Sequence, residues 1–251
     1  MILSFIGISF LLFAIWIVNP NNFQKKYFHK GEMEQEWIDF LIKHVEFYKR
    51  LNDIDKYKFG LRLIYFLNNT RVIGHNNYSV TINDKLLVGA SAIIPVFNFP
   101  NWRYSFINEV IIYEDYLKLK GFKGFIGGLV GYGLMEGKMI LVKKALYKGF
   151  SNNTDKINTG IHEFMHIIDK QDGVIDGIPK VLMHRTDIGP WLELIRIKSK
   201  EISKQKAKIN NYALANQAEF FAVVSEYFFE KPELMEKKHP LLYNILNKMF
   251  K

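Results

Sequence analysis

The sequence contains no cysteine among its 251 residues. Disulfides, thiolate zinc sites and thiol nucleophiles are therefore excluded together, and the composition fits a reducing compartment. The hydrophobic fraction of 49% is ample for a packed core, and the aromatic fraction of 15% argues against disorder. The length suits one domain of ordinary size with a short appendage.

No charged side chain precedes Lys25. Residues 1–18, MILSFIGISFLLFAIWIV, form an apolar run near the lower limit of about 18 residues for crossing a bilayer. A cleaved signal peptide is the alternative, but no basic segment precedes the run and no A-x-A-like site follows it; a buried helix is another. Lys25, Lys26 and Lys30 follow the run. The sequence thus predicts a transmembrane anchor at 1–18, a linker at 19–33 and a main domain at 34–251 in the cytoplasm.

Nucleic-acid-binding motifs are absent, although the formal net charge is +9. The basic stretch at 195–209 could meet nucleic acid or anionic lipid, but it reads more simply as the solvated face of a helix. The glycine-rich segment at 121–137 also lacks the G-x-G-x-x-G spacing of a phosphate-binding loop, and we interpret it as turns. Direct binding of nucleic acid is not expected.

Periodicity in the main domain indicates an α+β fold. Helical spacing of apolar residues predicts helices over 34–48, 54–67 and 83–94, with Asn83 and Asp84 as the cap of the third. Residues 109–113, EVIIY, are typical of a short strand. Residues 138–146, KMILVKKAL, alternate in part and carry lysines, which predicts an edge strand that could bind an extended peptide.

Residues 160–169, GIHEFMHIID, contain two histidines four positions apart, with a glutamate directly after the first. On a helix, His162 and His166 project from one face, about 5–6 Å apart at Cβ, and can hold one ion. Zinc accepts imidazole nitrogen without any thiolate. Glu163 is rotated away from that axis, where it can act as a general base on a zinc-bound water. A metal-free helical domain with a coincidental motif is the alternative.

A catalytic zinc usually has three protein ligands, so a third residue is required. The stretch at 211–230 has helical periodicity from Ala218 to Phe229, and it offers Glu219 and Glu226, which are seven apart and share one face. Acidic groups on an apolar helix are costly unless they meet a cation or another partner. Asn216 and Glu219 also have the spacing of a capping box, which leaves a purely structural interpretation of Glu219 open.

Two long segments resemble the peptidase family of Mlc titration factor A. HEFMHIIDKQDGVIDGIP is similar to the family's HEFAHxLDxxDGxxDGxP segment, and YALANQAEFFAVVSEYFFEKPELMEKKHPLLYNIL is similar to its YxxxNPAEFFAVxSExFFxxPxxLxxxxPxLYxxL segment. Fainter similarity extends upstream to Phe47. The chain departs from the pattern at Gln217, where the family often has proline, and it has no histidine between His75 and His162, where some members place an additional one.

The resemblance implies a zincin-like metallopeptidase domain whose core is similar to that of anthrax lethal factor. By this resemblance Glu219 is the third zinc ligand, and Tyr212 points its phenol at the substrate carbonyl oxygen, against the alternative of a half-buried loop aromatic. A ligating histidine commonly donates its other N–H to a carboxylate. Asp169 or Glu226 could accept that bond, unless they only form salt links at the helix ends.

The expected fold therefore has N-terminal helices, a small mixed sheet and two metal-binding helices, preceded by one membrane helix. The expected function is hydrolysis of peptide bonds in a peptide or protein substrate, with one Zn²⁺ per chain; Co²⁺ or Mn²⁺ fits the same ligands. The alternative is a membrane-tethered regulatory protein that sequesters a cytoplasmic partner, because the family's namesake sequesters a transcriptional repressor.

Overall fold

The computed structural model describes residues 32–118, 126–131, 133–151 and 156–251. Within these ranges no helix combines the length and the apolar character needed to cross a membrane. The predicted anchor at 1–18 and most of the predicted linker lie outside the described residues.

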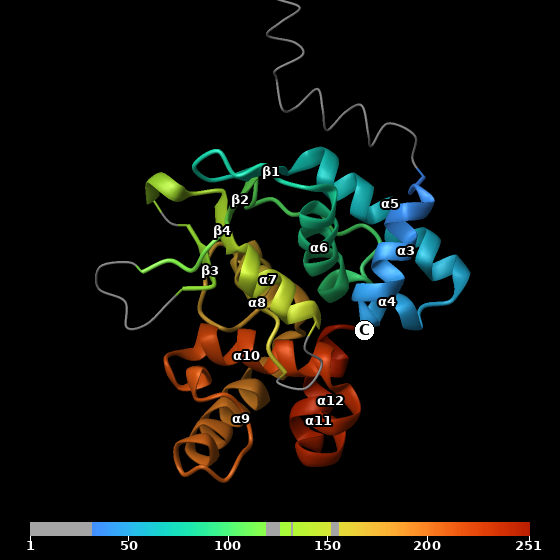
Figure 1. The fold of residues 1–251 in the computed structure, drawn as a ribbon. Helices are drawn as coiled ribbons and strands as arrows, with labels where there is room; N and C mark the ends of the chain where they lie inside the picture. Colours follow the sequence, from blue (N-terminus) through green and yellow to red (C-terminus); the bar gives the residue numbers. More distant parts are fainter. Residues whose placement is uncertain (1–31, 119–125, 132, 152–155) are drawn as a thin grey trace, which may run out of the picture.

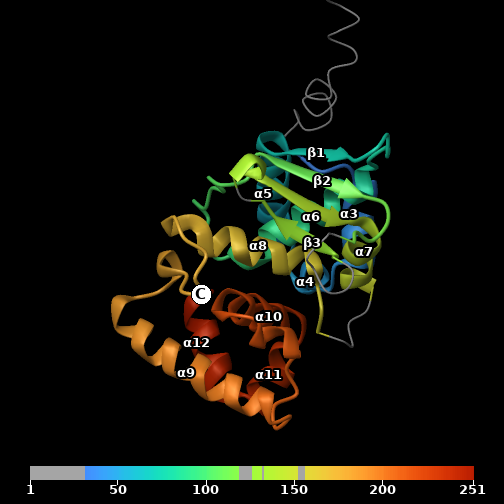
Figure 2. The ribbon, with the colours of Figure 1, turned by 90° about the vertical axis from the view of Figure 1, so that its left-hand side faces the viewer.

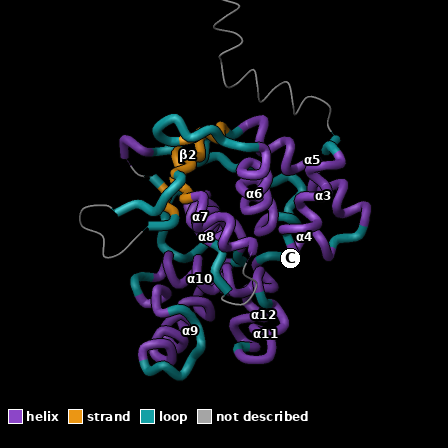
Figure 3. Tube along the Cα trace, in the orientation of Figure 1, coloured by secondary structure: helices purple, strands orange, loops and turns teal. Residues whose placement is uncertain are grey.

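One small sheet lies at one side of the molecule, with helices beside and below it, so the fold is α+β as predicted (Figures 1 and 3). The helices that precede or flank the sheet are α3 (Gln35–His44), α4 (Glu46–Arg50), α5 (Asp53–Asn69), α6 (Ile82–Ile93), α7 (Lys143–Ser151) and α8 (Thr159–Asp169). The C-terminal helices are α9 (Arg185–Ser203), α10 (Gln217–Glu230), α11 (Pro232–Lys238) and α12 (Pro240–Met249). The strands are β1 (Arg71–Gly74), β2 (Glu109–Tyr113), β3 (Gly128–Val130) and β4 (Lys138–Val142).

The sheet has four strands in the order β1-β2-β4-β3. β1 and β4 both pair with β2 in parallel, whereas β3 pairs with β4 antiparallel. The prediction of a small mixed sheet is thus confirmed, but the prediction of an edge strand over 138–146 is wrong. β4 ends at Val142, lies between two neighbours, and is buried from Met139 to Val142. Its lysines lie at its start and in α7, which begins at Lys143.

The edge strands are β1 and β3, and β3 comes from the glycine-rich segment that the sequence suggested was turns. Leu129 is paired with Ile140 of β4, and the flanking bonds join Gly131 N–H to Lys138 and Val142 N–H to Gly127. In an antiparallel ladder the backbone groups of successive residues point to opposite sides. The N–H and C=O groups of Gly128 and Val130 therefore face away from β4.

The N-terminal helices follow the predicted apolar periodicity, with two differences at their ends. The first predicted helix is broken at Val45, whose backbone is extended, into α3 and α4. α6 is capped by Thr81, not by Asn83 and Asp84: the Thr81 hydroxyl accepts the Asp84 N–H, and the Asp84 carboxylate accepts the Thr81 N–H at 2.7 Å. This reciprocal capping box satisfies backbone donors that the helix itself leaves unpaired.

Helix α8 runs through the middle of the molecule and is buried from Gly160 to Asp169. It packs on α6, α7 and β3 on one side and on α10 on the other (Figures 1 and 2). Gly160 permits this close packing, because a Cβ there would lie 2.1 Å from the Ser91 hydroxyl oxygen of α6. The position of α8 is thus fixed by backbone approach as well as by its apolar side chains.

Replacing Gly160 by alanine should destabilise the fold. The added methyl group collides with Ser91 and with Leu146 of α7, and overpacking of this kind costs about 1–3 kcal/mol. The matched control is Gly60→Ala in α5, where the new methyl meets only the flexible tip of Met33. Urea unfolding measures both. A Gly160→Ala protein as stable as Gly60→Ala would contradict the packing described here.

Candidate metal centre

The N-terminus of α8 is fixed by Asn158, whose side-chain oxygen accepts the Ile161 N–H at 3.1 Å. One turn further on, His162 and His166 project from the same face of the helix, and each is only 8% exposed. Their rings lie 4.9 Å apart, and their Nε2 atoms face each other at 3.2 Å. The helix therefore delivers two imidazole nitrogens to one point, as the spacing predicted.

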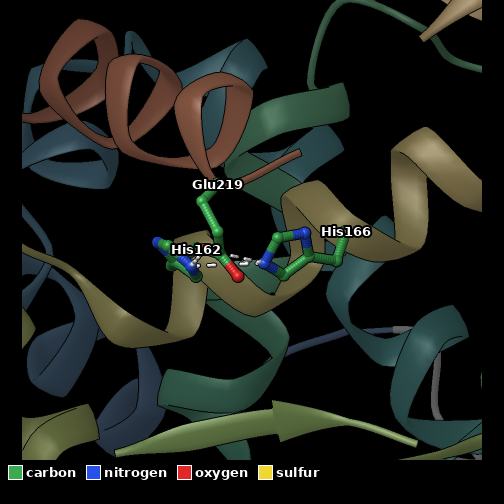
Figure 4. Close-up of side chains that lie close together, drawn as sticks. All are labelled: His162, His166 and Glu219. Atoms are coloured by element: carbon green, nitrogen blue, oxygen red, sulfur yellow. Dashed lines mark hydrogen bonds and ion pairs between the residues drawn. The ribbon is translucent and has the colours of Figure 1, made fainter. Parts of the chain in front are cut away.

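Helix α10 brings Glu219 to the same point from the opposite side (Figure 4). Asn216 caps this helix by accepting the Glu219 backbone N–H at 2.9 Å. The Glu219 carboxylate does not return to the cap: its Oε2 lies 2.9 Å from His162 Nε2 and 3.5 Å from His166 Nε2. The capping interpretation thus applies to the backbone of Glu219, and its side chain belongs to the histidine cluster.

The three candidate ligand atoms form a triangle with sides of 2.9, 3.2 and 3.5 Å. Ligands at about 2.0–2.1 Å from zinc in a tetrahedral shell lie about 3.3 Å from one another. The triangle therefore matches one face of such a shell. His162, His166 and Glu219 are also the group of described residues whose donor atoms converge closely enough to hold a metal ion.

The charges in this centre also fit a cation. Burial by itself raises the pKa of Glu219, but hydrogen bonds from His162 and His166 outweigh it and hold that pKa below its usual value. Burial lowers the pKa of His162, yet Glu226 and Glu219 reverse the effect and raise it well above its usual value. The surrounding carboxylates thus favour a positive charge at the point where the two imidazoles meet.

Glu226 is the carboxylate that contacts the second nitrogen of a histidine, with its Oε1 3.3 Å from His162 Nδ1. For Asp169 the expectation fails. Its Oδ2 accepts the Gly177 N–H at 2.7 Å, while its Oδ1 and the His166 Nδ1 have no hydrogen-bond partner within the described part of the chain. This bond holds Gly177, which has a φ of 78° and passes so close to α10 that a Cβ there would lie 2.2 Å from the Gln217 carbonyl oxygen.

Glu163 lies beside the histidines and under β3. A Cβ at Gly128 would come within 2.5 Å of the Glu163 Cγ, so the glycine allows the edge strand to approach this side chain. The Glu163 side chain is buried, and burial raises the pKa of its carboxyl group, although His162 and His166 partly counteract this. The Glu163 carboxylate therefore binds a proton more tightly than an exposed glutamate does.

Tyr212 lies on the 3-10 helix η5 (Asn211–Leu214), just before α10. Its ring centroid is 5.9 Å from that of His162, and the residue is 53% exposed. Partial burial raises the pKa of Tyr212 to about 12. The phenol is thus a neutral hydrogen-bond donor beside the histidines at physiological pH.

A cleft of about 710 Å³ opens onto this centre. The cleft is lined by the two histidines, Glu163 and Glu219. Residues of β3 and Tyr212 also line it, and those of β3 are Gly128, Leu129 and Val130. The size is in the range of pockets that bind small organic molecules or short peptides. The cleft therefore exposes the candidate metal ligands, the edge strand and Tyr212 to one bound molecule.

Two positions at this site were not singled out from the sequence. Gly128 stood in a glycine-rich run with no sign of a strand. Asn158 precedes Thr159 and Gly160 at the start of the helical pattern, and its position as an N-cap could have been found from that signal.

Comparison with known proteins gives one family match. The family described as "Glucose-regulated metallo-peptidase M90" matches residues 21–251. A protein of Synechocystis described as uncharacterized is 25% identical over 91% of this chain and 88% of its own length. Mlc titration factor A of Pectobacterium atrosepticum is 25% identical over 80% of each chain. That of Yersinia enterocolitica is 35% identical, but the match spans 45% of this chain and 44% of the relative.

Loss of one candidate ligand should abolish stoichiometric metal binding. We expect purified, metal-loaded protein to carry about one equivalent of divalent metal per chain, and Glu219→Ala and His162→Ala to carry far less after dialysis, because two protein ligands hold such an ion weakly. His184→Ala, which changes an exposed histidine outside the cleft, is the control. Elemental analysis measures the content. Equal metal in all four proteins would place the ion elsewhere.

Metal affinity should rise with pH. His162 has a raised pKa in the metal-free protein because Glu226 and Glu219 outweigh the effect of burial, and a protonated imidazole cannot bind a metal. Binding near neutral pH should therefore release a proton, and the dissociation constant should fall as the pH rises above about 6.5, the usual pKa of an imidazole. Calorimetric titration in buffers of different ionisation enthalpy measures both effects. A pH-independent dissociation constant without proton release would contradict the assignment of that proton.

Proposed function

The chain belongs to the glucose-regulated metallopeptidase M90 family, and from this membership and the geometry of its centre we propose that it hydrolyses peptide bonds with a single zinc ion. The observation that carries the proposal is the convergence of His162 Nε2, His166 Nε2 and Glu219 Oε2 at the floor of a cleft. Family membership implies a metal, and these three residues are the ones that would hold it. When bound, the ion supplies Lewis-acid chemistry that activates water and polarises the peptide carbonyl.

Glu163 is proposed as the general base. Its carboxylate accepts a proton from the attacking water molecule and then gives that proton to the amine that leaves. Burial raises the pKa of this carboxyl group, which suits it to accept and release a proton near neutral pH. Gly128 lets β3 cover Glu163 closely, so the carboxylate is shielded from bulk water on that side.

β3 is proposed to bind the substrate backbone, in place of the edge strand that the sequence suggested over 138–146. The N–H and C=O groups of Gly128 and Val130 face away from β4, and both residues line the cleft. An extended peptide added to this edge gains main-chain hydrogen bonds regardless of its sequence. β3 contacts α8, so such a peptide passes close to Glu163 and the two histidines.

Tyr212 is proposed to donate a hydrogen bond to the carbonyl oxygen that gains negative charge during the attack. Its pKa of about 12 keeps the hydroxyl protonated, and a neutral donor aimed at developing charge stabilises a transition state more than a ground state. Its exposure of 53% leaves the ring accessible to a bound peptide.

Replacement of Glu163 by glutamine should separate metal binding from turnover. The amide cannot accept the proton, so kcat on peptide substrates should fall by about 10²–10⁴-fold, while metal content stays at the wild-type level. A peptide-library assay with parallel elemental analysis measures both. Glu236→Gln, which makes the same change at an exposed glutamate outside the cleft, is the matched control. Wild-type turnover in the metal-loaded Glu163→Gln protein would eliminate the proposed mechanism.

A second candidate is a regulatory role through association with another protein. The name Mlc titration factor A, which several relatives carry, describes titration of a partner. By this proposal the chain sequesters a transcriptional regulator, and the apolar run at 1–18 tethers the complex to a membrane with the main domain in the cytoplasm. Glu163→Gln distinguishes the two roles, because it would leave partner binding intact while it removes proteolysis.

A further inference from the structure

Asn158 is completely buried at the junction between α8 and α10. Neither the family motif nor the metal ligands include it. Each of its polar groups nevertheless has a partner on one of the two helices that carry the candidate ligands. Its two oxygen atoms accept hydrogen bonds from backbone N–H groups of α8, and its N–H groups donate to carboxylates of α10.

The acceptors of Asn158 hold the first turn of α8. Its side-chain oxygen accepts the Ile161 N–H at 3.1 Å, and its backbone oxygen accepts the His162 N–H at 2.9 Å. The residue that caps the helix is therefore bonded directly to the backbone of a candidate ligand. Small movements of Asn158 would be transmitted to the His162 ring.

The donors of Asn158 reach across to α10. Its side-chain amide donates to Glu230 Oε1 at 3.0 Å, and its backbone N–H donates to the Glu226 carboxylate. Glu226 in turn lies 3.3 Å from His162 Nδ1. A closed path thus runs from Asn158 through Glu226 to the ring of His162 and back through the backbone of α8.

We propose that Asn158 is a positioning residue that clamps α8 to α10, holds Glu226 against His162 and thereby sets the affinity of the centre for its metal. The inference rests on the proposed metal site. Outer-shell partners of a ligating histidine fix its tautomer and orientation, and their loss typically costs about 10–100-fold in metal affinity. Asn158 does not contact the His162 ring itself but acts on it through Glu226, so we expect its loss to lower the metal affinity by about 10-fold.

Only asparagine combines the two tasks at this position. Aspartate is an equally good N-cap, but its carboxylate cannot donate to Glu230 and would face Glu230 and Glu226 with like charge. Gly149 of α7 packs closely against this residue, because a Cβ at Gly149 would lie 2.9 Å from the Asn158 Cα and 3.1 Å from its side-chain oxygen. Capping and clamping can therefore be separated by Asn158→Asp.

Titration of the metal-free, full-length protein with Co²⁺ tests the proposal, with the visible absorption bands as a readout of a tetrahedral site. Asn158→Asp should retain the α8 cap and the backbone bond to Glu226, but it loses the donor to Glu230 and places a like charge beside both carboxylates, so the Co²⁺ affinity should fall about tenfold. Glu230→Gln should stay near wild type, because its side-chain oxygen still accepts from Asn158. The double variant N158D/E230Q should recover most of the affinity, because the glutamine amide can donate to the aspartate and restore the bond in reverse.

A folded Asn158→Asp protein that binds Co²⁺ like wild type would show that Asn158 is only a helix cap and would overturn the clamp. A double variant that binds Co²⁺ no more tightly than Asn158→Asp would also overturn the clamp. If Asn158→Asp does not fold, Glu230→Ala removes the α10 acceptor and leaves the α8 cap intact; it should also lose affinity, and wild-type affinity in it refutes the proposal. Wild-type protein that binds no Co²⁺ would instead overturn the metal centre itself, and the clamp with it.

Discussion

The contact between the Glu219 carboxylate and the two imidazoles of α8 is the interaction on which the centre depends. It joins residues 57 positions apart in a largely buried environment, with His162 Nε2 and Glu219 Oε2 at 2.9 Å. A buried carboxylate without a partner is costly, and two facing imidazole nitrogens need either a shared proton or a cation between them. Each group thus offsets the burial of the others, and loss of any one leaves the rest uncompensated.

The fold maintains this contact by fixing the backbone of both helices near the ligands. α8 is held by close approach to α6 at Gly160 and by the Asn158 cap. α10 is held by the Asn216 cap and by the passage of Gly177, where a Cβ would lie 2.2 Å from the Gln217 carbonyl oxygen. Rigid helices with locked first turns can place donor atoms within the few tenths of an ångström that a metal shell requires.

Local sequence patterns predicted the parts of the site that depend on one element. The four-residue spacing of His162 and His166 and the apolar periodicity of 218–229 were enough to locate both helices. The order of the strands could not be predicted from the sequence. β3 is only three residues long, and its place at the edge depends on its pairing with β4, which local sequence patterns do not encode. Without β3, the close approach of Gly128 to Glu163 could not be inferred. The sequence also suggested that Asp169 accepts a hydrogen bond from a ligating histidine, whereas in the structure it accepts the Gly177 N–H.

The double use of Glu219 shows why its role was ambiguous from the sequence. Spacing from Asn216 describes where the backbone N–H goes, and that bond is present at 2.9 Å. It does not determine the side chain, which in a capping box would return to the cap backbone. The bond to Asn216 involves only the Glu219 backbone N–H, and the carboxylate extends away from the cap toward the histidines of α8. The cap and the ligand are therefore not competing interpretations: the cap fixes the first turn of α10 from which Glu219 reaches the histidines.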